Sequence, residues 1–355
     1  MLLMNRCVHS SENRNLSFWK GIACIFIVLL HSQLPGVVGY SVDVLSRFAV
    51  PFFFLISGYY LMSEKQEGQI EKQERIKRKI KSNLIVFLWA TLVYLVYQGI
   101  NFCIVEGYSI TEFIKEFFYP SGLVFMLLFN RITYASHLWF VASLLYAYFT
   151  IYVLIRLKIN FEKRGFVILS VIALSAGIIV REICLLKPVS ILSFTTADVS
   201  FFRNWILLAL PLVILGNSLR TIKNNIIINI NNITLEIAIF LGCIVSFIEK
   251  WYSINYLGTH LDLYFGTILC TFALFIYTIN NSKVCYSEYV ANIGRDLSLY
   301  IYILHVLLIM ILTNHYTGNF ADLSDIQRYL VTCVVLIGTV FLAWCIDKVK
   351  ESKRS

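Results

Sequence analysis

The sequence predicts an all-α polytopic membrane protein that crosses the bilayer about ten times. Of its 355 residues, 58% are hydrophobic and 14% are charged, against roughly 45–50% and about 25% in an average soluble domain. Apolar runs recur along the whole chain, and about 20 helical residues are needed to cross the hydrocarbon core. The spans should be helices, because an open sheet edge would leave unpaired backbone groups in lipid.

The apolar runs leave no segment for a soluble domain, so we expect a single membrane domain over residues 1–355. The first run lacks a small-residue cleavage site and should be a retained span rather than a signal peptide. The expected spans are 16–34, 42–62, 84–102, 137–156, 165–183, 204–219, 233–249, 262–280, 296–314 and 328–346.

Basic residues set the expected orientation. Most of the 30 Lys and Arg residues lie in the loops on the N-terminal side of the membrane, and cytoplasmic loops carry such an excess. We therefore expect both termini in the cytoplasm and a multi-pass protein of the inner (cytoplasmic) membrane. The same distribution accounts for the net charge of +9 without a nucleic-acid partner. The nine cysteines occur singly, without a CxxC, so we expect neither a disulfide framework nor a metal site.

Two of the expected loops are long. The inner loop Ser63–Asn83 is rich in Lys, Arg and Glu, and the outer loop Cys103–Ser136 contains the apolar piece Ser121–Asn130. That piece is too short to cross the membrane, which indicates a re-entrant or interfacial helix.

Ionisable side chains fall inside several spans, where each costs roughly 2.5–3.5 kcal/mol on insertion scales and so asks for a partner or a role. Lys20 and His31 are eleven residues apart, which places them on one face of the first span. Spacing alone leaves two interpretations open: Lys20 as a snorkelling anchor with His31 at the interface, or both as part of a site. The ionisable residues in question are Lys20, His31, Arg47, Asp262 and His305.

The second span combines Arg47 with Pro51 and the pair Ser57–Gly58. Proline frees a backbone carbonyl, and a small pair permits close helix approach or a break. The sequence fits either an irregular backbone beside a cavity or a kinked packing helix.

A polybasic cluster precedes the third span. Such clusters commonly bind anionic lipid or set topology. Alternatively, Arg and Lys side chains at an inner mouth could hold the diphosphate of a nucleotide-based donor. The cluster consists of Arg75, Lys77, Arg78, Lys79 and Lys81.

Three later positions are candidates for a binding site. His137 and Trp139 open the fourth span, where Trp139 could equally be an aromatic-belt residue. Arg203 stands at the outer end of the sixth span. His305 lies near the middle of the ninth, where a buried histidine bonded to a backbone carbonyl is the plainer alternative.

Taken in order, these pieces resemble the membrane acyltransferase-3 family, bacterial proteins that mainly O-acetylate surface polysaccharides. Together they cover nearly the whole chain. One departure concerns the first-span motif, in which the family usually has an Arg ten residues before the His, often after an Asp; here Lys20 and Ser17 stand at those positions. The matching pieces are Lys20–Ala23, Val28–Ser32, Ser46–Tyr59, Lys77–Lys81, His137–Phe140, Arg203–Asn204, Leu210–Pro211 with Gly216, and Ser298–His305.

The resemblance implies an acyl donor, usually acetyl-CoA, entering from the cytoplasm, and a carbohydrate hydroxyl as acceptor on the outer side. It implies that His31 is a general base or a transient acyl carrier. Lys20 and Arg47 would position it or steady developing oxyanion charge. Arg75, Arg78 and Lys81 are then the expected holders of the CoA phosphates. The expected acceptor-binding residues are His137, Trp139, Arg203 and His305.

Two rival functions remain open at this stage. A relative of the family forms the membrane half of serine racemases, so a transporter for a small solute or an amino acid is one alternative. A structural or regulatory membrane protein is the other, and the charges inside the spans count against it.

Overall fold

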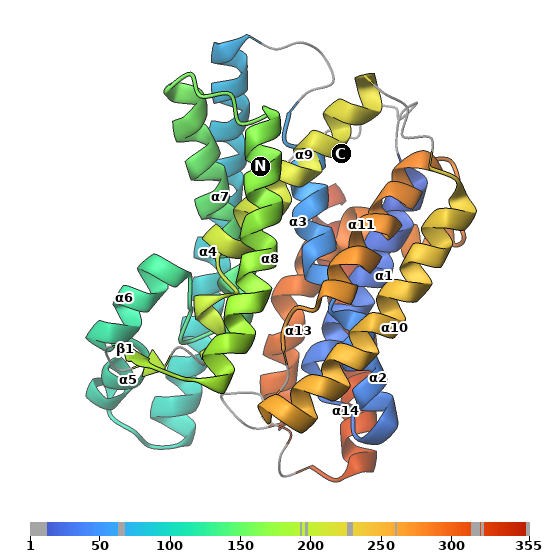
Figure 1. Ribbon diagram of the computed structural model, residues 1–355. Helices are drawn as coiled ribbons and strands as arrows, with labels where there is room; N and C mark the ends of the chain where they lie inside the picture. Colours follow the sequence, from blue (N-terminus) through green and yellow to red (C-terminus); the bar gives the residue numbers. More distant parts are fainter. Residues whose placement is uncertain are drawn as a thin grey trace. The chain divides into compact units, whose positions relative to one another are not determined.

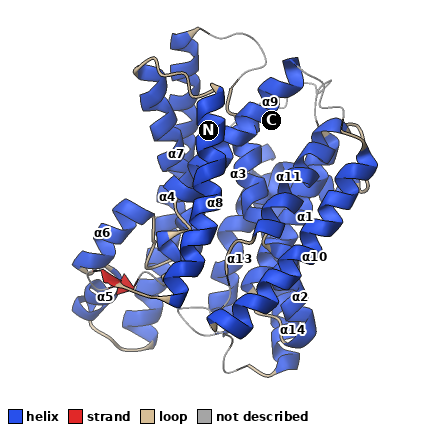
Figure 2. Cartoon of the chain, in the orientation of Figure 1, coloured by secondary structure: helices blue, strands red, loops and turns tan. Residues whose placement is uncertain are grey.

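The computed structural model describes residues 13–62, 68–191, 194–195, 198–225, 230–259, 261–313, 320 and 323–352. This part of the chain is helical apart from one short antiparallel pair of strands, β1 (Ser190–Ile191) and β2 (Phe194–Thr195) (Figure 2). The expected all-α class is confirmed. The α-helices are α1 (Arg14–His31), α2 (Gly36–Ser46), α3 (Ala49–Tyr59), α4 (Gln69–Gly99), α5 (Ile110–Phe117), α6 (Pro120–Phe129), α7 (Trp139–Arg156), α8 (Arg164–Leu186), α9 (Leu210–Asn225), α10 (Asn232–Leu257), α11 (Phe265–Asn280), α12 (Glu288–Asn292), α13 (Ser298–Thr313) and α14 (Asp325–Ser352).

Short 3₁₀ and π-helical turns precede or continue several of these helices. They are η1 (Ile100–Val105), η2 (Ser136–Leu138), η3 (Val199–Phe201), η4 (Trp205–Ala209) and η5 (Ile293–Leu297).

Within the described residues, eight helices are long and apolar enough to cross a membrane. The expected spans 204–219 and 262–280 correspond to shorter apolar helices, Trp205–Thr221 and Phe265–Asn280. Position 314, the end of the ninth expected span, lies outside the described residues. The protein is therefore a multi-pass membrane protein. The eight helices are Arg14–His31, Gly36–Tyr59, Gln69–Val105, Ser136–Arg156, Arg164–Leu186, Asn232–Leu257, Glu288–Thr313 and Asp325–Ser352.

The prediction of an inner loop at Ser63–Asn83 is wrong over most of that range, because α4 is continuous from Gln69. Residues 63–67 lie outside the described part. Gly68 begins the helix, where the Glu71 carboxylate accepts from the Gly68 N–H, and the Lys77–Glu74 pair three residues apart supports its exposed face. Hydropathy marks where lipid begins rather than where a helix begins, so a charged helical extension was mistaken for a loop.

The second expected span is a helix with an interruption. Its two parts, α2 and α3, are separated at Arg47 and Phe48. The break lies four residues before Pro51, and a proline ring clashes with the carbonyl of residue i−4, here Arg47. The sequence fitted an irregular backbone beside a cavity or a kinked packing helix, and the structure shows a helix interrupted at Arg47 and Phe48. The apolar piece of the outer loop forms α6, which ends at Asn130 in the left-handed region with φ of 51°.

The chain divides into two compact units, which we describe separately. Unit 1 comprises the described residues of 54–229 and 252–262, and unit 2 those of 4–53, 230–251 and 263–355.

In unit 1, α4 and α7 pack antiparallel (Figure 1). Gln69, at the start of α4, donates to the carbonyl of Ile155 near the end of α7 at 3.1 Å. Further along α4, Asn83 donates to the carbonyl of Val141, in the first turn of α7, at 2.9 Å. Helix α8 packs on α9 in the same unit. The first residues of α4 and the last residues of α7 therefore lie at one end of this helix pair, and the first residues of α7 lie at the opposite end.

Helices α3 and α9 approach closely at two glycines of unit 1. A Cβ at Gly58 would overlap the carbonyl oxygen of Val213, and one at Gly216 would overlap that of Leu55. The sequence left close helix approach or a break open at Ser57–Gly58, and the structure has the close approach at Gly58. Small residues are common at helix contacts in membrane proteins.

Unit 2 is built around α1, which contacts α2, α11, α12, η5, α13 and α14. Asn13 caps α1 by accepting from the Leu16 N–H at 2.8 Å, and its amide donates to the Thr278 carbonyl at 3.0 Å. These bonds fix the start of α1 to the end of α11. An apolar core follows along α1, formed by Cys24, Val28, Leu297, Ile301, Ile309, Phe320, Val335 and Ala343.

Candidate functional site

Helix α1 carries Lys20 and His31, as the sequence predicts. His31 is its last residue and is partly exposed. Lys20 is also partly exposed and interacts electrostatically with Asp296 of η5 and with Cys24. A carboxylate partner for Lys20 was missing from the sequence interpretation, because Asp296 is remote in the chain.

His31 and His305 come together in unit 2. Their ring centroids are 5.0 Å apart and their planes are inclined by 55°. His305 is fully buried on α13, and its Nδ1 lies 3.0 Å from the carbonyl oxygen of Ile301. Because a carbonyl only accepts, Nδ1 carries the proton in the neutral ring and Nε2 carries the lone pair. The structure thus joins two histidines that the sequence placed in separate spans, and fixes the tautomer of one.

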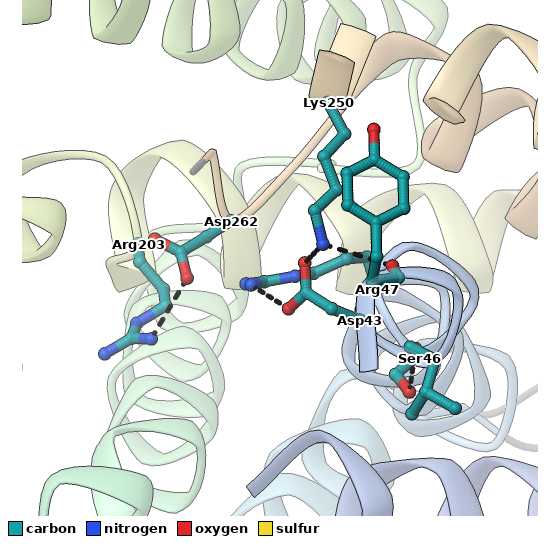
Figure 3. Close-up of polar contacts among 8 residues, drawn as sticks. Asp43, Ser46, Arg47, Arg203, Lys250 and Asp262 are labelled. Atoms are coloured by element: carbon teal, nitrogen blue, oxygen red, sulfur yellow. Dashed lines mark hydrogen bonds and ion pairs between the residues drawn. The ribbon is translucent and has the colours of Figure 1, made fainter. Parts of the chain in front are cut away.

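Arg47 belongs to a small charged cluster of unit 2 (Figure 3). Its Nη2 lies 2.5 Å from Oδ1 of Asp43, one turn earlier on α2. Oδ2 of Asp43 accepts from Nζ of Lys250 on α10 at 2.6 Å, and Lys250 also donates to the Tyr40 carbonyl at 3.1 Å. Lys250 is only 2% exposed. The spacing of four between Asp43 and Arg47 was visible in the sequence, but nothing in it indicated Lys250.

The side of unit 1 where α4 begins carries a concentration of positive charge, which we call the basic end: Arg75, Lys79 and Arg220. Lys79 interacts electrostatically with two like charges, Arg75 on its own helix and Arg220 on α9. Arg220 donates to the carbonyls of Tyr59 at 2.8 Å and of Met62 at 3.1 Å, which fixes its guanidinium.

Two of the three expected phosphate ligands lie elsewhere on the surface of α4. Arg75 is partly buried, but Arg78 and Lys81 are exposed. Sequence reasoning placed Lys79 in the polybasic cluster but not among the three expected phosphate ligands, and it did not connect Arg220 with them. The shared face of Arg75 and Lys79, four residues apart, was an available signal. An acid lies at this side too: Glu162 pairs with Lys72 at 3.4 Å.

Trp139 and Arg203 meet where α7 begins. The Arg203 guanidinium lies 4.9 Å from the Trp139 ring centroid, and its Nη1 is 3.5 Å from Oδ1 of Asp262 (Figure 3). His137 is buried, with its ring 4.7 Å from that of Tyr94. The structure therefore supports a grouping of Trp139 and Arg203, adds Asp262 to it, and places His137 against α4.

Two further arginines lie in the same part of unit 1. Arg131, just after α6, pairs with Asp198 at 2.9 Å. Arg181, near the end of α8, lies over the Phe202 ring at 5.5 Å and interacts electrostatically with Asp198, Asp262 and Arg203. We call this group the Arg–Asp cluster: Arg131, Arg181, Arg203, Asp198 and Asp262.

Asn130 and Asn204 shape the backbone around the Arg–Asp cluster. Asn130 is fully buried, and its side-chain oxygen accepts from the Trp205 N–H at 3.0 Å. Asn204 caps η4 by accepting from the N–H groups of Ile206 and Leu207 at 2.9 and 3.0 Å. These amides hold the segment that carries Arg203 against the end of α6.

The fold and these groups define a helical membrane protein with histidines and arginines at its helix ends and interior. The chain belongs to the membrane acyltransferase-3 family: the acyltransferase domain of that family matches residues 13–348.

A serine/alanine racemase from Enterococcus gallinarum is similar to part of this chain. It is 33% identical over 141 residues, covering 38% of this chain and 18% of the racemase. The chain therefore spans less than a fifth of that relative's length. No solved structure matches the chain.

Proposed function

We propose that the protein transfers an acetyl group from acetyl-CoA to a hydroxyl of a cell-surface or exported glycan. The observation that carries this proposal is the contact between His31 and His305 in a chain that belongs to an acyltransferase family. A histidine is the side chain best suited to take and return a proton near neutral pH.

His31 acts in this scheme as the general base. It takes the proton of the acceptor hydroxyl as the oxygen attacks the thioester carbonyl, the C–O bond forms, and the C–S bond breaks. The proton then passes from His31 to the departing CoA thiolate. The alternative, in which the acyl group rests on His31 between donor and acceptor, uses the same residue as nucleophile.

His305 orients His31 in both schemes. With its Nδ1 bonded to the Ile301 carbonyl, His305 has its lone pair on Nε2, and the ring-centroid spacing of 5.0 Å leaves room for an N–H of His31 to approach Nε2 to hydrogen-bond length in the reacting complex. Such a bond would leave the lone pair of the other His31 nitrogen for the reaction. A third group that fixes the tautomer of a catalytic imidazole is a recurring arrangement.

Lys20 and Arg47 take different parts in this proposal. Lys20 lies on α1 about 16 Å along the helix axis from His31, so we assign it to the interaction with Asp296 of η5 rather than to the oxyanion that forms at His31. Arg47 is bonded to Asp43, which also binds Lys250, so we assign it to fixing α2 against α10 rather than to contact with substrate.

The basic end is the proposed site for the donor phosphates. Guanidinium and ammonium groups are the usual partners of phosphate, and three of them gather in Arg75, Lys79 and Arg220. The excess of basic residues near this side supports a cytoplasmic orientation for it. We also propose that both termini lie in the cytoplasm and that the chain crosses the inner membrane ten times, with Trp205–Thr221 and Phe265–Asn280 crossing in addition to the eight longer helices.

The test uses purified protein in lipid nanodiscs, radiolabelled acetyl-CoA and extracted surface glycan. We expect His31→Ala to abolish transfer, because the variant loses the imidazole that takes the proton of the acceptor hydroxyl. His305→Leu should lower kcat by about 10²-fold with little change in KM. His305→Gln should recover much of kcat, because its amide oxygen can accept the same bond.

Two results would overturn the proposal. Full transfer by His31→Ala would show that His31 is not the catalytic base. Solute uptake into liposomes without acyl transfer would show that the protein is a transporter and not an acetyltransferase. In cells, the matching measurement is the loss of O-acetyl NMR signals from the surface glycan of a deletion strain and their return with the wild-type gene.

A further inference from the structure

We propose that Cys243 and Cys270 form a dithiol site, which a hydrophobic two-electron acceptor of the quinone class oxidises to a disulfide from the lipid side. Cys243 lies on α10 and Cys270 on α11, and both belong to unit 2. Their separation of 27 residues along the chain does not indicate such a pair. The reaction is separate from the acetyl transfer proposed above and does not depend on it.

The two thiols are in direct contact. The Sγ atoms of Cys243 and Cys270 lie 3.8 Å apart, where one S–H donates to the other sulfur. Both residues are free thiols. The sulfurs of a disulfide are about 2.05 Å apart, so the pair has about 2 Å left to close. The structure therefore presents the reduced form of a dithiol whose partners are already selected.

The backbones of α10 and α11 touch beside the thiols. A Cβ at Gly242 would overlap the backbone nitrogen of Cys270, and one at Gly266 would overlap the carbonyl oxygen of Gly242. Glycines allow this kind of approach between membrane helices. Since the backbones are already in contact, the disulfide can form without the two helices moving closer together.

Polar contacts one helical turn or more from the thiols fix the register of the two helices. The hydroxyl oxygens of Ser246 and Thr267 lie 3.2 Å apart. The two carboxylate oxygens of Glu249 accept from the backbone N–H groups of Phe265 and Gly266, each at 2.9 Å. A shift of α11 along α10 would break these bonds. The same register keeps the two cysteines opposite each other.

The surroundings of Cys243 indicate where the oxidant comes from. Helix α10 is long and apolar enough to cross a membrane, and Cys243 lies near its middle and is partly exposed. Its neighbours Phe240, Leu241 and Ile244 are exposed large apolar side chains, as expected on a helix face that contacts lipid. A charged oxidant is costly to bring into such surroundings. A quinone is uncharged and hydrophobic, and it accepts two electrons.

The oxidation balances between the dithiol and one quinone. The sulfur of Cys243, the more exposed of the two, bonds first to the quinone. The sulfur of Cys270 then attacks that of Cys243, and the reduced quinone leaves. In total, two S–H bonds break and one S–S bond forms, while the quinone takes up two electrons and two protons and becomes a quinol. A dithiol reductant reverses the change.

The disulfide would join two helices that already contribute to the packing of unit 2. Nζ of Lys250, on α10, donates to Asp43 of α2 at 2.6 Å, so a bond between α10 and α11 also strengthens the connection of α11 to α2. A disulfide stabilises a fold mainly by restricting the unfolded chain. Oxidation should therefore raise the melting temperature, and reduction should lower it again.

The experiment uses the reduced full-length protein in nanodiscs that hold one chain each. The protein is incubated with an alkylated benzoquinone whose ring carries no hydrogen for a thiol to replace, or with oxidised glutathione. The remaining thiols are blocked with N-ethylmaleimide in denaturant, and mass spectrometry of the digest quantifies the linked Cys243–Cys270 peptide. We expect about tenfold more of this peptide with the quinone, because glutathione is charged and does not enter the hydrocarbon.

Two serine variants provide a matched comparison. Cys243→Ser removes one thiol of the pair, and Cys333→Ser removes an exposed thiol of α14 in the same unit. After quinone treatment, the wild type and Cys333→Ser should melt several degrees above their dithiothreitol-treated forms. Cys243→Ser should show no such shift, and its Cys270 should be fully blocked by N-ethylmaleimide.

Two results would overturn the inference, and both are read on the wild-type chain, so neither depends on a variant that folds. If quinone treatment left Cys243 and Cys270 as open to N-ethylmaleimide as Cys333, the two thiols would not form a dithiol site. If oxidised glutathione produced the linked peptide as efficiently as the quinone, the oxidant would reach the pair from water rather than from lipid.

Discussion

The two charged groups of unit 1 are built in opposite ways. At the basic end, Lys79 interacts with two like charges, Arg75 and Arg220. In the Arg–Asp cluster, Arg131 pairs with Asp198, Arg203 pairs with Asp262, and Arg181 interacts electrostatically with both aspartates. The first group holds its charges near one another despite repulsion, and the second is largely neutralised by its own side chains.

This difference indicates different roles for the two groups. A group of like charges suits a polyanion, whose several negative charges relieve the repulsion when it binds. A cluster in which arginines pair with aspartates compensates its charge within the protein. The first group therefore agrees with the proposed donor, which carries several phosphates.

The largest effect is expected from Gly216→Ala, which would break the basic end and spare the Arg–Asp cluster. Its side chain would collide with the Leu55 carbonyl at the contact of α3 and α9, and Arg220 lies one turn further along α9. We expect a loss of about 3 kcal/mol or more, or no folded protein. Thermal unfolding in detergent, followed by size-exclusion chromatography, measures it.

Gly177→Ala is the matched control for that change. Its added Cβ would lie 3.5 Å from Cβ of Leu207, an ordinary contact, so its melting temperature should stay near that of the wild type. Equal melting temperatures for Gly216→Ala and Gly177→Ala would contradict the close approach of α3 and α9.

The next effect concerns the donor. Lys79→Met should raise the KM for acetyl-CoA about tenfold, which corresponds to about 1.4 kcal/mol, because it removes one of three charges that gather at the basic end. Lys81→Met removes the same charge from an exposed position two residues away and should change the KM little. Initial rates at varied acetyl-CoA concentrations measure both, and equal effects would show that only the overall charge of α4 matters.

A smaller effect is expected within the Arg–Asp cluster. The Arg131–Asp198 pair is partly exposed, so its coupling free energy should be about 0.5–1 kcal/mol. A double-mutant cycle with Arg131→Gln and Asp198→Asn, read by thermal unfolding, gives this value. A coupling several times larger would mean that the cluster is held together mainly by this pair rather than by its surroundings.

The smallest effect lies in α5, which leads through α6 to the Arg–Asp cluster. The backbone N–H and the hydroxyl of Ser109 donate to Glu112, each at 2.8 Å, and hold the pKa of that carboxyl below its ordinary value. Since the folded-state pKa is depressed, this stabilisation is present above the ordinary pKa of a glutamate and is lost as the pH falls through the folded value.

Hydrogen exchange of α5 measures that loss. Protection of its amides should decrease on acidification in the wild type, whereas Glu112→Gln should make the protection independent of pH over the same interval. A wild-type helix with no change in acid would show that the cap contributes nothing to α5.

Sequence patterns were sufficient for the features that depend on composition and spacing along one helix. The apolar runs predicted a helical membrane protein. Pro51 and Ser57–Gly58 marked where the second span is interrupted and where it meets another helix, but the sequence left alternatives open at both places. Candidate residues such as His31 and His305 were also identifiable, because an ionisable group in an apolar run stands out. The helical extension of α4 was missed, because its charged residues form a helix as readily as a loop.

The sequence by itself determined that this chain is a membrane protein. It also determined which ionisable residues lie within apolar helices and therefore need a polar partner or a function there. Only the tertiary structure decided their partners: His305 beside His31, Lys250 with Asp43, Arg220 near Lys79, and Arg181 among two aspartates. Periodicity relates residues a turn apart on one helix. Contacts between helices depend on how separate helices pack, which spacing along the chain does not encode.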